Sequence, residues 1–103
     1  MAAPTAITSR IDRSLRALLA EVQDLPRTAE EWDALPDGER AAVALDWDHL
    51  LADYLVELDR FCREGEMTDD QQRHYQELLG KLREATPLLR RLGLLPLPIA
   101  LHT

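Results

Sequence analysis

The sequence has little cysteine, which limits its covalent and metal chemistry. Cys62 is the one cysteine among 103 residues, so no disulfide can form within the chain. A small secreted domain held together by disulfides is therefore excluded. The paired cysteines typical of structural zinc sites are absent as well.

Long hydrophobic runs are also missing. A helix that spans a bilayer needs about 20 apolar residues, and the uncharged stretch 92–101 is interrupted by Pro96 and Pro98. The opening residues MAAPTAITSR lack the basic and apolar regions of a signal peptide. We therefore expect no membrane association and, by default, a cytoplasmic location.

Glycine is scarce, and none of it forms a phosphate-binding pattern. The four glycines fit neither GxGxxG nor GxxxxGK, so no nucleotide or other cofactor is expected. No segment alternates apolar and polar residues for long enough to predict a strand. The sequence gives no positive indication of an enzyme.

Positive charge is scarce in the middle of the chain. The net charge is −7, and residues 28–66 alone carry −9, while the segments before and after each carry +1. This distribution repels polyanions, so affinity for nucleic acid or for anionic membranes is disfavoured. With 46% hydrophobic and 30% charged residues, the chain has the composition of a single folded domain over 1–103.

The first expected helix, residues 9–25, carries a narrow apolar seam whose members are spaced alternately four and three residues apart. Pro26 predicts the end of this helix, because a proline disfavours the α conformation of the preceding residue. Thr28 and Glu31 have the spacing of a capping box, which predicts a separate short helix over 29–35 that clasps the longer ones. The seam consists of Ile11, Leu15, Leu18, Val22 and Leu25.

The longest expected helix, residues 38–64, is the centre of the predicted bundle, with Asp37 as its N-cap. Two adjacent apolar stripes run along it, so it needs more than one neighbour, while its opposite side is charged and faces water. One stripe consists of Val43, Trp47, Leu50, Tyr54, Leu58 and Phe61, and the other of Leu51, Leu55, Leu58 and Cys62.

Two further helices are expected after a turn at Gly65. Thr68 and Gln71 form a second capping box, which predicts a helix over 69–85. Thr86 as cap and Pro87 as first helical residue predict a restart over 87–92, with Gly93 as its left-handed terminus. The fold class is therefore all-α: an antiparallel helical hairpin, a third long helix, a short clasp helix and an extended apolar tail over 93–103.

The apolar tail and the seam of the first helix predict a partner. A small domain gains stability when it shares apolar surface, and the tail can cover its own bundle or a groove on another chain. We expect a non-enzymatic interaction or oligomerisation module, either a two-fold homodimer or a complex with a helical protein. The predicted partner-binding residues are Leu15, Leu18, Val22, Leu94, Leu95, Leu97, Ile99 and Leu101.

Metal binding and catalysis have weaker support. Asp46 with His49, and His74 with Glu77, have the spacing of bundle metal sites. In a hairpin that turns at 66–67, however, the two pairs lie roughly 15 Å apart along the axis, so no metal site is expected. Cys62 and His74 are closer in that register and form the alternative, a thiol–imidazole enzyme site.

A small DNA-associated regulator, similar to an antitoxin, is the other alternative. Residues 68–83, TDDQQRHYQELLGKLR, follow a tight turn and carry amide and basic side chains, as recognition helices do. Arg10, Arg13 and Arg16 form a basic stripe on the first helix. Two aspartates open the candidate recognition helix and would face phosphates, so we expect no nucleic-acid partner.

Overall fold

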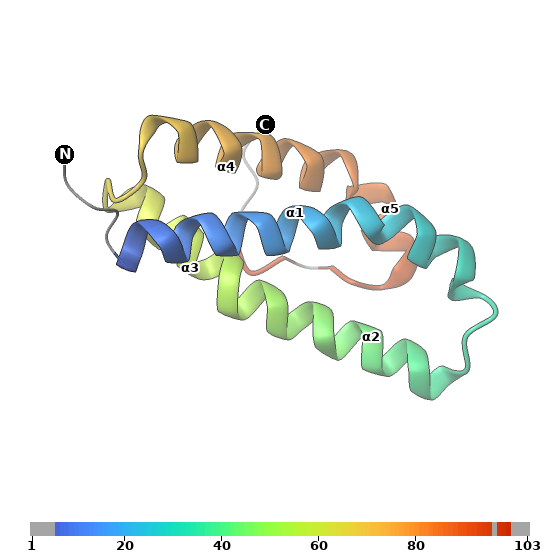
Figure 1. Ribbon diagram of the computed structural model, residues 1–103. Coiled ribbons are helices and arrows are strands. Elements are labelled where there is room, and N and C mark those ends of the chain that lie inside the picture. The colour runs from blue at the N-terminus through green and yellow to red at the C-terminus, as the bar shows by residue number, and fades with distance from the viewer. Residues whose placement is uncertain (1–5, 96, 100–103) are drawn as a thin grey trace.

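The computed structural model describes residues 6–95 and 97–99, and all regular structure in these residues is helical (Figure 1). The predicted all-α bundle is confirmed. Figure 1 shows α1 and α4 running in one direction and the α2–α3 segment running in the other. The elements are α1 (Ala6–Trp32), α2 (Asp37–Leu50), the π-helical turn η1 (Leu51–Leu55), α3 (Val56–Arg63), α4 (Asp69–Glu84) and α5 (Thr86–Leu92).

The helix break predicted at Pro26 is wrong, because α1 continues through this proline to Trp32. The Thr28 hydroxyl donates to the carbonyl oxygen of Asp24 at 3.3 Å, so it does not cap a new helix. Leu25 and Ala29, on either side of Pro26, are both buried in the core. Burial of the continued seam outweighs the hydrogen bond that proline removes, and the first part of the predicted clasp helix is the last turn of α1.

Arg40 closes the turn between α1 and α2. Its side chain donates from Nε to the carbonyl oxygen of Trp32 at 2.8 Å and from an Nη atom to that of Asp33 at 3.0 Å. The last carbonyl groups of a helix lack intrahelical donors. The carbonyl oxygen of Trp32 also accepts from the N–H of Leu35 at 3.1 Å, and the guanidinium adds a second bond there. Asp37 lies in the first turn of α2, and the N-cap is Pro36, one residue earlier than predicted.

The predicted central helix exists as the continuous segment α2–η1–α3. At η1 the N–H of Val56 donates to the carbonyl oxygen of Leu51, which is the wider spacing of a π-helix. Such a turn changes the direction of a helix. In Figure 1, α3 lies along α1, whereas α2 diverges from it. Sequence spacing did not predict this turn.

The capping box at the start of α4 is confirmed, and its glutamine also bonds to α1. Gln71 and Thr68 bond each other's backbone N–H groups. Gln71 is 3% exposed, and its amide Nε2 also donates to the carbonyl oxygen of Thr8 at 3.1 Å and to Asp12 Oδ1 at 2.8 Å. One buried amide therefore joins the first turn of α4 to the first turns of α1.

The restart before α5 is confirmed, with one difference at its cap. Ala85 is the N-cap, and the Thr86 hydroxyl instead donates to the carbonyl oxygen of Leu82 at 3.1 Å. Gly93 ends α5 at a φ of 73°, the left-handed conformation that glycine adopts without strain. This turn directs Leu94 back onto the bundle, where it is buried.

The core lies around α1, which packs closely against η1, α3, α4 and α5. The side chains contributed by α1 are those of its predicted seam together with Ser14 and Ala29. Residues from the other helices and Leu94 complete the cluster. Within the part of the chain that the structure describes, no helix is both long and apolar enough to cross a membrane.

Candidate interaction surfaces

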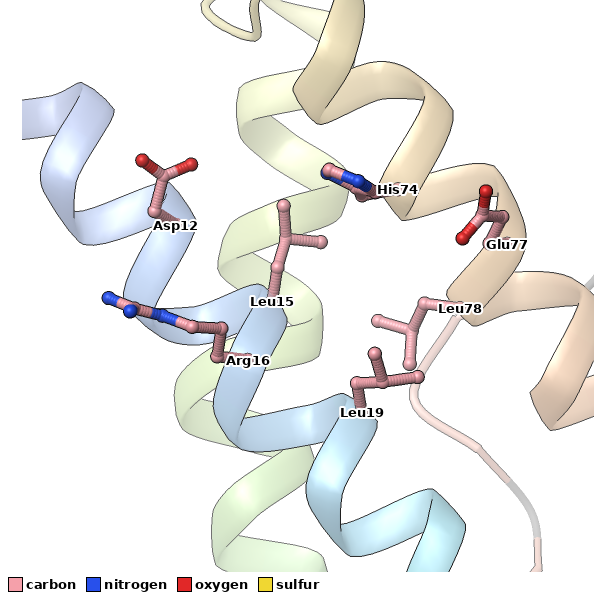
Figure 2. Close-up of a pocket in the computed structure, with 7 residues that line it drawn as sticks. All are labelled: Asp12, Leu15, Arg16, Leu19, His74, Glu77 and Leu78. Carbon is pink, nitrogen blue, oxygen red and sulfur yellow. The ribbon is translucent and has the colours of Figure 1, made fainter.

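A groove of about 330 Å³ runs between α1 and α4 (Figure 2). Leucine side chains form its floor: Leu15 is buried and Leu19 half-buried on α1, and Leu78 is buried on α4. The charged and polar groups at its edges are of both signs, so the groove favours neither a cationic nor an anionic partner. These edge residues are Asp12, Arg16, His74 and Glu77.

The two pairs considered for metal binding remain separate. His74 lines the groove between α1 and α4, whereas Asp46 lines a hollow between α1 and α2. Over residues 6–95 and 97–99, no three histidine, cysteine, aspartate or glutamate side chains lie close enough together to hold one ion.

Cys62 and His74 line different hollows, and no hydrogen bond joins the thiol and the imidazole within the described chain. Cys62 lines a hollow together with Asp59, Tyr75 and, from the tail, Pro98 and Ile99. Burial raises the pKa of Tyr75, and the charge of Asp59 raises this pKa further. The Tyr75 hydroxyl, which remains protonated, donates to Asp59 Oδ1 at 3.4 Å. This neighbour of Cys62 is thus a protonated structural group.

The residues proposed for DNA contact are partly used within the fold. Arg10 lies across the carboxylate of Glu57 on α3, with Nε 2.5 Å from Oε1 and an Nη atom donating to Oε2 at 2.7 Å. Gln71, at the start of the candidate recognition helix, is buried and bonded to α1. Arg13 and Arg16 are exposed. Of the features that suggested DNA binding, these two arginines remain at the surface together with Gln72, Arg73 and His74.

The predicted partner-binding residues lie mostly inside this chain. Leu15, Leu18 and Val22 are buried in the core, and Leu94 is 4% exposed. Further along the tail, the described side chains are half-buried and pack against the same core; they are Leu95, Leu97 and Ile99. Leu101 lies outside the described residues. The seam of α1 is therefore occupied by the bundle itself.

A second hollow, of about 320 Å³, lies between α1, α2 and Leu94, and we call it the Trp47 cleft. Trp47 is 4% exposed, and its indole Nε1 has no hydrogen-bond acceptor among the residues that the structure describes. A buried donor without an acceptor costs about 1–3 kcal/mol. The other lining residues are Glu21, Leu25, Thr28, Val43, Asp46 and Leu50.

The outer face of α2 carries apolar side chains that the described chain leaves uncovered. Leu45 is 56% exposed, and the other exposed large hydrophobic residues within 6–95 and 97–99 are Ile7 at 40% and Val56 at 41%. Ala41 and Ala42, one turn before Leu45, are also exposed. Residues three and four positions apart share one side of a helix. We call the Trp47 cleft and this face together the α2 surface.

The α2 surface was not predicted from the sequence, although one signal for it was present. Leu45 belongs to neither apolar stripe of the predicted central helix, so its spacing already placed it away from the core. No spacing indicated that Glu21 and Trp47 line one cleft, because their relative positions depend on how α1 and α2 diverge.

Comparison of the chain with models of protein families, with curated proteins and with solved structures found no match. Function is therefore inferred from the residues of this chain alone. The candidate surfaces for binding a partner are the groove between α1 and α4 and the α2 surface.

Proposed function

We propose that the protein is a non-enzymatic interaction module that binds a helix of a partner protein on the α2 surface. The observation that carries this proposal is the poor burial of α2. Of its 14 residues only Trp47 is buried, while Leu45 is the most exposed large hydrophobic residue of the described chain. An apolar helix face of this kind gains from burial against a partner helix.

The α2 surface is preferred to the groove between α1 and α4 for two reasons. The groove is part of a helix pair that is already packed and bonded through Gln71. The α2 surface presents an exposed leucine that a partner could cover, beside an open cleft lined by apolar side chains and two carboxylates.

Binding of a neutral amphipathic peptide tests this proposal. The probe is a helix of about 15 residues, long enough for partial helicity, with a leucine stripe and glutamine elsewhere. We expect it to bind the full chain and to lose roughly tenfold in affinity when Leu45→Ser removes the central apolar contact. Isothermal titration gives the dissociation constants.

Ile7→Ser is the matched control, because Ile7 is an exposed apolar residue on α1, outside the α2 surface. The control should bind the peptide as the natural sequence does. Equal binding by Leu45→Ser and the natural sequence, or no binding by either, would refute the proposal.

A second copy of the chain is the other occupant to consider, since the sequence predicted a homodimer. Light scattering distinguishes the two directly, because one chain has a mass of 11.7 kDa. A mass near twice this value that falls in Leu45→Ser would assign the α2 surface to self-association.

A further inference from the structure

The charges on and around the α2 surface specify its partner further, on the basis of the function proposed above. Asp46 and Asp48 follow Leu45 in α2, and Glu21 faces Asp46 from α1 across the Trp47 cleft. All three are exposed, and among the described residues none of them forms an ion pair. By contrast, Asp24 and Asp59 on the same helical segments are each paired with an arginine.

These charges disfavour a second copy of the chain as the occupant. α2 has four carboxylates and one arginine, so two α2 helices packed together would place like charges side by side. The surrounding segment 28–66 carries a net charge of −9. A partner with positive charge meets attraction where a second copy meets repulsion.

The Trp47 cleft has the chemistry that receives a long cationic side chain. Its walls are apolar, from Leu25, Val43 and Leu50, and two carboxylates lie at its edge. Lysine and arginine have an aliphatic stem that packs on apolar walls and a charged end that reaches polar groups. The cleft volume of about 320 Å³ is that of a few side chains.

We propose that the partner helix is basic, and that one of its lysine or arginine side chains enters the Trp47 cleft between Glu21 and Asp46. The apolar stripe of the helix covers Leu45 and the alanines beside it.

Two peptides that differ only in charge test this proposal on the full chain. One is the leucine–glutamine helix described above, and in the other lysine replaces the glutamines beside the leucine stripe. We expect the lysine peptide to bind roughly tenfold more tightly at low salt, because several exposed ion pairs of modest strength add together. This advantage should shrink as salt is added.

Two variants locate the effect. Glu21→Gln with Asp46→Asn should remove most of the advantage that the lysine peptide has over the glutamine peptide. Glu84→Gln, a remote exposed position on α4, is the control for loss of negative charge and should retain the advantage. In a Trp32→Phe background, the fluorescence of Trp47 should change when the lysine peptide binds.

Each other outcome overturns the inference in a distinguishable way. Equal affinity for the two peptides, lost in both cases by Leu45→Ser, would leave the proposed function standing and show that the partner need not be basic. A lysine advantage that survives Glu21→Gln with Asp46→Asn would exclude the cleft. No binding by either peptide would refute the proposed function as well, with a dimer mass pointing to a second copy.

Discussion

α1 and α2 contrast in how their apolar residues are arranged, and this decides how much of each helix is buried. Half of α2 is apolar, yet of its 14 residues only Trp47 is buried. α1 has a smaller apolar share over its 27 residues, but it buries seven residues, six of them apolar, because its apolar residues repeat on one side. Amphipathic spacing therefore matters more than apolar content. The apolar residues of α2 point in all directions, and those on its outer face remain available to a partner.

The largest effect on stability should come from a substitution in the buried seam of α1. Leu18→Ala should lower the free energy of unfolding by about 2–5 kcal/mol, because Leu18 is fully buried in the seam of α1. Leu45→Ala, the same change on the outer face of α2, should stay within about 0.5 kcal/mol. Urea denaturation of the two variants gives both values. Similar losses for the two would show that α2 is packed as firmly as α1.

A gain of about 2 kcal/mol is expected from Pro26→Ala, which restores a backbone N–H donor inside α1. The gain is partly offset because alanine makes the unfolded chain more flexible than proline does. The midpoint of thermal unfolding should rise accordingly. A lower midpoint would mean that the restricted backbone of proline, and not burial of the continued seam, stabilises this part of α1.

Gln71→Ala tests the polar link that holds α4 to α1. The variant loses one half of the capping box, the bond from the Thr68 N–H to Gln71 Oε1, and two bonds to α1, which should cost about 1–3 kcal/mol. Gln72→Ala, the same change at the next and exposed position, should be nearly neutral. Equal effects of the two substitutions would show that the Gln71 side chain does not hold α4 to α1.

Trp47→Phe should have the smallest effect, less than about 1 kcal/mol, although it reduces a buried side chain. The loss of packing is offset because phenylalanine removes the donor that has no acceptor. Chemical denaturation measures the difference. A loss of several kcal/mol would show that the indole N–H is bonded in the folded protein.

The sequence predicted the elements that depend on local spacing. The seam of α1, the Thr68–Gln71 capping box and the Gly93 terminus are all where the pattern placed them. Pro26 was misjudged because a local rule favoured a break, while burial of Leu25 and Ala29 favoured continuation. Tertiary packing outweighed local preference there.

The candidate site was predicted less well than the fold, because it depends on how two helices pack and not on local spacing. The α2 surface arises because η1 turns the central helix, so that α2 diverges from α1 and leaves a cleft at Trp47. A π-helical turn of five residues has no marker in its composition. The predicted partner residues were instead assigned from the most apolar segments, and these are the segments that the bundle itself buries.

Amide hydrogen exchange with and without the lysine peptide tests the central claim most directly. In the free protein the amides of α2 should exchange faster than those of α1, and the peptide should slow them while exchange in α1 and α4 changes little. Equal protection of α1 and α2 in the free protein, with no change on addition of the peptide, would contradict the assignment of α2 as the binding surface.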